Sequence, residues 1–107
     1  MKPFVKNAAD ESQVKSAVEK EKRGRERELN DMRHILSSVQ GRRFVWKLLG
    51  KCGIFTSSYS HSGSEMYFKE GHRNIGLLIL NDLTDADPEA YISMMMESKK
   101  EGDNSNV

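Results

Sequence analysis

The sequence predicts an all-α protein: a small helical bundle built on a central helical hairpin, with a long charged N-terminal helix and a short C-terminal helix. Apolar residues recur at helical spacing in every main segment of the chain. Helix start and stop signals separate these segments, among them Ser62 with Glu65 and the glycine at position 53. The one apolar run of strand length, residues 75–80, has no second strand to pair with.

Residues 8–36 form the first predicted helix, because they contain no proline and one glycine and are rich in helix formers. Their middle part is almost wholly charged, with opposite charges four residues apart, as at Glu19 and Arg23. Apolar residues form a weak early stripe and a stronger late one: Val14, Ala17 and Val18, then Leu29, Met32, Ile35 and Leu36. We therefore expect a leader and exposed charged helix over residues 1–28, a helical core domain over residues 29–100, and a disordered tail over residues 101–107.

The second predicted helix runs from about Val39 to Cys52, with Ser37 or Ser38 as its N-cap. Its apolar face is broad: Phe44, Val45, Leu48, Leu49 and Cys52, with Trp46 at the margin. Gly53 follows at the position where a left-handed C-cap is required. This is the clearest helix stop in the sequence.

The third predicted helix starts near Gly63, where Ser62 and Glu65 make a capping box. Its expected inward face is again broad: Tyr67, Phe68, Gly71, Ile75, Leu78, Ile79 and Leu83. Gly71 and Gly76 are costly inside a helix, so we expect another helix to approach closely at both. A strand over residues 75–80 is the alternative, but the capping box favours the helix.

The fourth predicted helix opens at Asp87-Pro88-Glu89, a cap residue followed by proline at the first helical position. It continues to about Lys100 and carries three consecutive methionines, which cannot all face one core. Methionine is common at adaptable contact surfaces. The predicted partner interface therefore combines both ends of the chain: Val14, Val18, Met94, Met95 and Met96.

Charge is unevenly distributed along the chain, although the net charge is only +1. Residues 42–81 carry six Lys/Arg against two Asp/Glu, whereas residues 82–107 carry two against seven. A one-sided basic surface is typical of phosphate contacts, and the alternative is a solvated face that pairs with acidic residues. No base-reading motif is present, so nucleic-acid binding is expected to be non-specific. The candidate phosphate or partner contacts are Arg33, Arg42, Arg43, Lys47, Lys51, Lys69 and Arg73.

The sequence predicts no catalytic, cofactor-binding or metal-binding residues. A single cysteine excludes an intramolecular disulfide and a Cys-based zinc site. Glu65, Glu70 and His72 lack a nucleophile to act with, and the loop at residues 60–64 lacks the lysine of a phosphate-binding loop. No segment approaches the roughly 20 apolar residues that span a bilayer, and the first residues lack the apolar part of a signal peptide. We expect no enzyme activity, no small-molecule substrate and no membrane association.

Three sequence blocks follow one another in the centre of the chain: Gly41-Arg42-Arg43-Phe44-Val45-Trp46, then Cys52-Gly53-Ile54-Phe55, then Phe68-Lys69-Glu70-Gly71-His72-Arg73-Asn74-Ile75-Gly76-Leu77. In order and spacing, about residues 41–80 resemble a family of small tailed-bacteriophage (podophage) proteins named after a Bordetella phage gene product. His72 stands where the family pattern has arginine. The resemblance implies a phage origin and a gene set concerned with head and tail morphogenesis, and it carries over no catalytic or binding residues.

Packing of the predicted hairpin would place Trp46 against Tyr67 or Phe68. A polar network would cross the same hairpin: Arg42, Arg43, Glu70, Arg73 and Asn74. Arginines held in such a network are not free to bind phosphate, so it is the structural alternative to a basic binding face.

Two functions follow as hypotheses. The first is a non-enzymatic small phage protein of the virion or its assembly, which acts through helix-mediated contacts with itself or other phage proteins in the virion or the host cytoplasm. The second is an early accessory protein that binds nucleic acid non-specifically, or a host factor, through the basic face.

Overall fold

The structure, a computed structural model, describes residues 8–105, with side chains described for residues 10–102. These residues form four helices and no strand, which confirms the all-α prediction: α1 Ala8–Leu36, α2 Val39–Lys51, α3 Gly63–Ala86 and α4 Ala90–Ser105. The alternative of a strand over residues 75–80 is wrong, because this segment lies inside α3. The predicted leader at residues 1–7 and the last two residues of the predicted tail lie outside the described residues.

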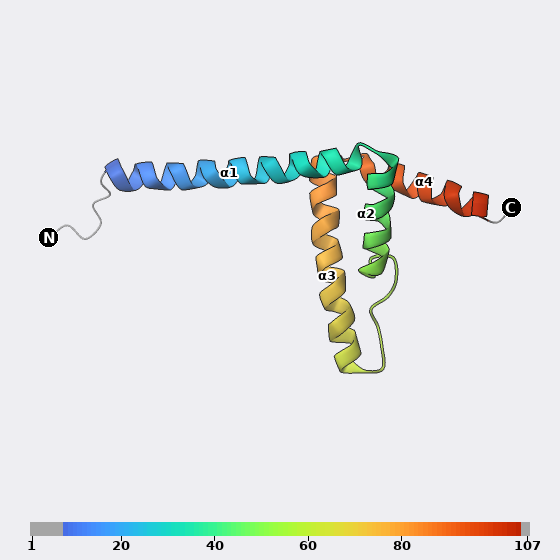
Figure 1. The fold of residues 1–107 in the computed structure, drawn as a ribbon. Coiled ribbons are helices and arrows are strands. Elements are labelled where there is room, and N and C mark those ends of the chain that lie inside the picture. Colours follow the sequence, from blue (N-terminus) through green and yellow to red (C-terminus); the bar gives the residue numbers. More distant parts are fainter. Residues whose placement is uncertain (1–7, 106–107) are drawn as a thin grey trace.

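The four helices meet at one end of the α2–α3 hairpin (Figure 1). α2 and α3 lie side by side, α1 crosses the upper end of α3, and α4 extends from that end in the opposite direction to α1. The radius of gyration is 20.5 Å, whereas a compact domain of this length has a value of about 13 Å. The N-terminal halves of α1 and α3 therefore extend away from the common junction (Figure 1).

The hydrophobic core lies at this junction and takes residues from all four helices. Its most deeply buried side chains are Leu49 of α2, Leu83 of α3 and Met94 of α4. The rest of the core is small: Leu36, Val45 and Ala90, with Met32, Trp46, Ile54, Ile79, Leu80 and Tyr91 packed around it. Leu29 is the first buried side chain along α1, and the side chains of residues 10–24 are all exposed.

Trp46 does not pack where the sequence indicated. Its ring lies 4.7 Å from that of Phe55 and 5.6 Å from that of Tyr91, between centroids. Tyr67 and Phe68, its expected partners, are 82% and 67% exposed. The prediction was wrong because α2 ends at Lys51, so only the following loop accompanies the first half of α3 (Figure 1).

Local capping interactions set both ends of α2, as predicted. The Ser38 hydroxyl accepts a hydrogen bond from the backbone N–H of Gly41 at 3.0 Å. At the other end Gly53 adopts φ 79°, a left-handed conformation that favours glycine. Its N–H donates to the Gly50 carbonyl at 3.0 Å and that of Ile54 to the Leu49 carbonyl at 3.3 Å. These two bonds make a Schellman motif, which ends the helix.

The predicted cap of α3 is confirmed, with one difference. The Ser62 hydroxyl accepts from the N–H of Glu65 at 3.3 Å, but the reciprocal bond passes through Ser60. The Ser60 hydroxyl accepts from the N–H of Ser62 at 3.2 Å and donates to the Glu65 carboxylate at 2.9 Å. Lys69 and then Ser60 stabilise the charged carboxylate, which lowers the pKa of Glu65.

α4 differs from its predicted bounds at both ends. Asp87 accepts from the N–H of Glu89 at 3.1 Å, as the predicted cap should, but the helix begins at Ala90. It continues to Ser105, so residues 101–105 are helical. The prediction that these residues are disordered was wrong. The physical reason is an ion pair: Arg43 of α2 donates to Glu101 at 2.8 Å and holds the last turns of α4.

At Gly76, α3 lies close against the end of α2. A Cβ atom there would lie 2.7 Å from Cys52 Cβ and 2.8 Å from the Ile54 side chain. A Cβ at Gly71 would have nothing within 4 Å. The predicted close approach is therefore confirmed at Gly76 and wrong at Gly71, within the described part of the chain.

Replacing Gly76 should destabilise the protein. For Gly76→Ala we expect a net loss of about 1–2 kcal/mol in the free energy of unfolding, because overpacking costs about 1–3 kcal/mol and the better helix propensity of alanine offsets up to ~1 kcal/mol. Urea unfolding monitored by circular dichroism measures it. The control is Gly24→Ala, where nothing lies within 4 Å and no loss is expected. Equal effects of the two substitutions would contradict the close approach.

Candidate interaction surfaces

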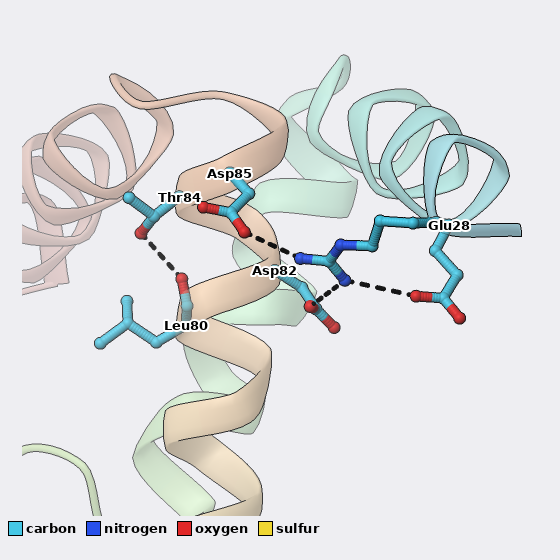
Figure 2. Close-up of polar contacts among 6 residues, drawn as sticks. Glu28, Leu80, Asp82, Thr84 and Asp85 are labelled. Carbon is cyan, nitrogen blue, oxygen red and sulfur yellow. Dashed lines mark hydrogen bonds and ion pairs between the residues drawn. The ribbon is translucent and has the colours of Figure 1, made fainter. Parts of the chain in front are cut away.

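Arg25 attaches α1 to α3 through two aspartates (Figure 2). Its guanidinium donates to Asp82 at 2.7 Å and to Asp85 at 2.8 Å, and it also reaches Glu28 of its own helix at 3.3 Å. Asp82 and Asp85 are three residues apart, so both carboxylates lie on one face of α3 (Figure 2). The hydrogen bond to Asp82, followed by that to Asp85, raises the pKa of Arg25 above its ordinary value.

Sequence reasoning missed this contact, although a signal for it exists. Asp82 and Asp85 lie in the last two turns of α3, where the helix dipole disfavours negative charge. An acidic pair in such a place indicates a cation supplied by another part of the chain. The sequence does not say that the cation is Arg25, which lies 57 residues from Asp82.

Two of the basic residues predicted to contact phosphate or a partner bind helix C-termini of this chain instead. Arg33 donates from Nε to the carbonyl of Ala86, the last residue of α3, at 2.8 Å. Arg42 donates from Nη1 to the carbonyl of Leu36, the last residue of α1, at 2.8 Å. Carbonyls in the last turn of a helix lack an intrahelical donor, and a positive charge there is favourable to the dipole. Both arginines therefore cap helices of their own chain.

The α2–α4 contact uses two further ion pairs. Arg42 reaches Glu97 at 2.8 Å, and its side chain is only 20% exposed. This hydrogen-bonded pair raises the pKa of Arg42. Arg43 is bound to Glu101 on the next turn of α4. The prediction of a polar network across the α2–α3 hairpin was therefore wrong for these two residues, because both arginines bind carboxylates of α4.

The other members of the predicted network behave differently. Glu70 accepts a hydrogen bond from the hydroxyl of Ser58, in the loop that runs beside α3. Among the described residues, Arg73 and Asn74 make no ion pair or side-chain hydrogen bond. Four of the seven predicted basic contacts are therefore already paired within the chain: Arg33, Arg42, Arg43 and Lys69.

Two of the seven predicted basic contacts lie near each other. Lys51 and Lys69 line a shallow hollow of about 250 Å³ between the end of α2, the following loop and α3, together with His72. Lys69 forms an ion pair with Glu65 at 3.0 Å. Within residues 10–102, Lys47 and Lys51 have no ion-pair partner. The seven residues thus do not make one free basic face.

The predicted partner interface is divided by the structure. Val14 and Val18 are exposed on the part of α1 that extends from the junction, and Met95 and Met96 are exposed on α4. Met94 is fully buried in the core, so the prediction that it belongs to a partner interface was wrong. The helical turn allows only one of three consecutive residues to face inward, and Met94 is that residue.

A larger apolar surface lies on α3, where the sequence placed the inward face. We call it the α3 stripe: Tyr67, Phe68, Gly71, Ile75 and Leu78. The four side chains other than glycine are at least 55% exposed. Leu83 and Ile79 of the predicted inward face do pack in the core, and the other buried positions of α3 are Gly76 and Ala86. The stripe was found in the sequence but assigned to the wrong environment.

The comparisons with known proteins give the family. Residues 32–96 match the family model described as Bbp19-like phage protein. Because this match covers more than half of the chain, the chain belongs to the family of Bbp19-like phage proteins, which confirms the resemblance drawn from residues 41–80. No curated protein and no solved structure matched the chain.

The matched segment begins near the first core residues of α1 and ends in the middle of α4. It includes the core cluster and the α3 stripe, and it leaves out the exposed part of α1 together with Arg25, Glu97 and Glu101. No helix in the described residues is long and apolar enough to cross a membrane. The same residues hold no cluster of three His, Cys, Asp or Glu side chains that could bind a metal ion.

Removing the guanidinium of Arg25 should release α1 from α3. For Arg25→Ala we expect faster amide hydrogen exchange in residues 25–36, because both aspartates lose their cation and the dipole of α3 then disfavours them. Hydrogen exchange measured by mass spectrometry tests this. The matched control is Arg23→Ala, whose side chain is 72% exposed and contacts only Glu19 of its own helix. The role of Arg25 would be contradicted if both variants exchanged alike.

Proposed function

We propose that this phage protein is a non-enzymatic component of the virion or of its assembly, which acts through helix-mediated contacts with itself or with other phage proteins. Its place of action is the virion or the host cytoplasm. The observation that carries the proposal is the α3 stripe, an apolar helix face left open to solvent on a small chain. Soluble monomers rarely expose a large continuous apolar surface that has no binding role.

The shape of the chain also favours a protein-binding role over a catalytic one. The ion pairs and helix caps of the junction use arginines and carboxylates to join helices, so these groups are occupied in holding the fold. The exposed parts of α1, α3 and α4 offer long helical surfaces of the kind that dock against other helices.

Mass spectrometry of purified particles and of assembly intermediates tests the proposal. We expect peptides of this chain in one or both fractions at a fixed ratio to the capsid protein. An early, non-structural protein of the same phage serves as the control and should be removed by the purification. Absence of this chain from virions and from intermediates alike would overturn the proposal.

The basic face gives a second test, of the alternative in which the chain binds nucleic acid. Each phosphate neutralised adds about −0.9 to the slope of log affinity against log salt. With Arg33, Arg42, Arg43 and Lys69 engaged within the chain, Lys47, Lys51 and Arg73 remain. Any binding to duplex DNA should therefore be weak, with a slope no steeper than about −3.

A gel-shift series over a range of salt concentrations measures this slope. Lys47→Glu with Lys51→Glu should remove whatever binding exists, whereas Lys15→Glu with Lys20→Glu on the exposed part of α1 should not. A slope near −6 would mean that the paired arginines also reach phosphate, and it would favour the nucleic-acid alternative over the proposal.

A further inference from the structure

One face of α3 is covered at one end and open at the other. Residues 67, 71, 75, 78, 82 and 85 follow one another at steps of three or four, so they share a face of the helix. At Asp82 and Asp85 this face is covered by α1, through Arg25 (Figure 2). From Tyr67 to Leu78, about three turns or roughly 16 Å, no described element covers it. The open part continues an interface that the chain already uses.

The composition of the α3 stripe suits a close helix–helix contact. It contains no charged residue, and its large side chains stand at both ends, with Gly71 between them. Glycine inside a helix costs about 1 kcal/mol relative to alanine. Gly71 has no neighbour within 4 Å that would explain its small size. A helix from outside the chain that approaches at this point supplies the explanation that the monomer lacks.

We infer that the α3 stripe is covered by the α3 stripe of a second copy, in an antiparallel pair with two-fold symmetry. This inference rests on the proposed function in that both act through helix contacts. The two-fold axis would pass near residues 72 and 73. Tyr67 of one copy then lies opposite Leu78 of the other, and Gly71 of one copy packs near Ile75 of the other. The same patch then serves both copies, as a two-fold interface requires.

The position of α1 selects the antiparallel arrangement. α1 covers the same face of α3 at Asp82 and Asp85, through Arg25. A parallel pair would bring the α1 helices of both copies to the same end of the interface, whereas an antiparallel pair places them at opposite ends.

The surface of the chain is large enough for such a pair. Its solvent-accessible area is 8607 Å², whereas a compact protein of 12.2 kDa exposes about 6,100 Å². The surplus of about 2,500 Å² per chain compares with the roughly 1,200–2,000 Å² that a stable interface buries over both partners. Part of the surplus lies on the exposed half of α1, and the α3 stripe contributes part of its apolar area.

Sedimentation equilibrium of the purified chain from 1 to 200 μM, on the order of typical dissociation constants for such interfaces, tests the inference. We expect a reversible monomer–dimer equilibrium. The double variant I75E/L78E should raise the dissociation constant at least about 100-fold, because two buried apolar contacts become charged. The matched control is V14E/V18E, which places the same charges on equally exposed valines of α1 and should leave the dimer intact. A monomer throughout, or a dimer that I75E/L78E does not weaken, would overturn the inference.

Gly71→Leu separates the interface from the fold. A side chain at this position meets nothing within the chain. The midpoint temperature of thermal unfolding of the monomer, measured at low concentration, should therefore be unchanged or slightly raised. Dimerisation should be weakened, since leucine prevents the close approach. Unchanged dimerisation by this variant would contradict the placing of Gly71 in the contact.

Disulfide trapping gives the direction of the pair. Y67C and L78C variants should cross-link to each other when mixed under mild oxidation, and each should cross-link to itself much less. The unsubstituted chain controls for Cys52, which is buried. Self-cross-links in place of mixed ones would show a parallel pair and overturn the antiparallel arrangement. Presence in virions is measured separately, so a monomeric chain found in particles would refute the pair and leave the proposed function standing.

Discussion

The difference in length between the two helices of the hairpin is the constraint on which the rest of this structure depends. α2 has 13 residues and α3 has 24, which corresponds to roughly 20 Å and 36 Å of helix. The left-handed Gly53 ends α2 through two well-formed backbone hydrogen bonds, so α2 cannot extend along its neighbour. The first half of α3 is left with a polar loop on one side and solvent on the others (Figure 1). From this mismatch comes the open shape of the chain. The α3 stripe is exposed because it lies on the side of α3 that α1 covers only at Asp82 and Asp85, and not on the side of Gly76, which packs against the end of α2.

A core this small needs polar contacts at its border to fix the angles between helices. Arginines of α1 and α2 perform that role, since each reaches a carboxylate or a terminal carbonyl on a different helix. Exposed ion pairs of this kind contribute little stability one by one. Their value here is directional: they hold α1 across the end of α3, and α4 against α2, at positions that apolar packing alone would leave loose. Three of the seven basic residues that suggested a nucleic-acid surface, Arg33, Arg42 and Arg43, are explained by this role.

The sequence predicted the parts of the fold that local chemistry determines. Ser38, Gly53 and Ser62 act on atoms within a few residues, so the ends of α2 and the start of α3 follow from the sequence. Partner choice over long distances does not. Nothing local distinguishes Glu97, 55 residues away, from Glu70 as the partner of Arg42.

The orientation of α3 was also beyond prediction, because the sequence offered two apolar faces. One face carries Tyr67, Phe68 and Ile75, and the other carries small and aliphatic residues such as Gly76 and Leu83. Aromatic residues suggested the core, yet the close approach at Gly76 determines which face packs inward. A face that looks like core in the sequence but lies open in the monomer is the expected property of an interface between chains.

Amide hydrogen exchange of the full chain at two concentrations tests most directly whether a second copy covers the α3 stripe. One concentration is well below the onset of self-association and the other is well above it. The account predicts that residues 67–78 of α3 become more protected at the higher concentration, while residues 10–24 of α1 exchange at the same rate in both. Exchange in residues 67–78 that does not change with concentration would contradict it.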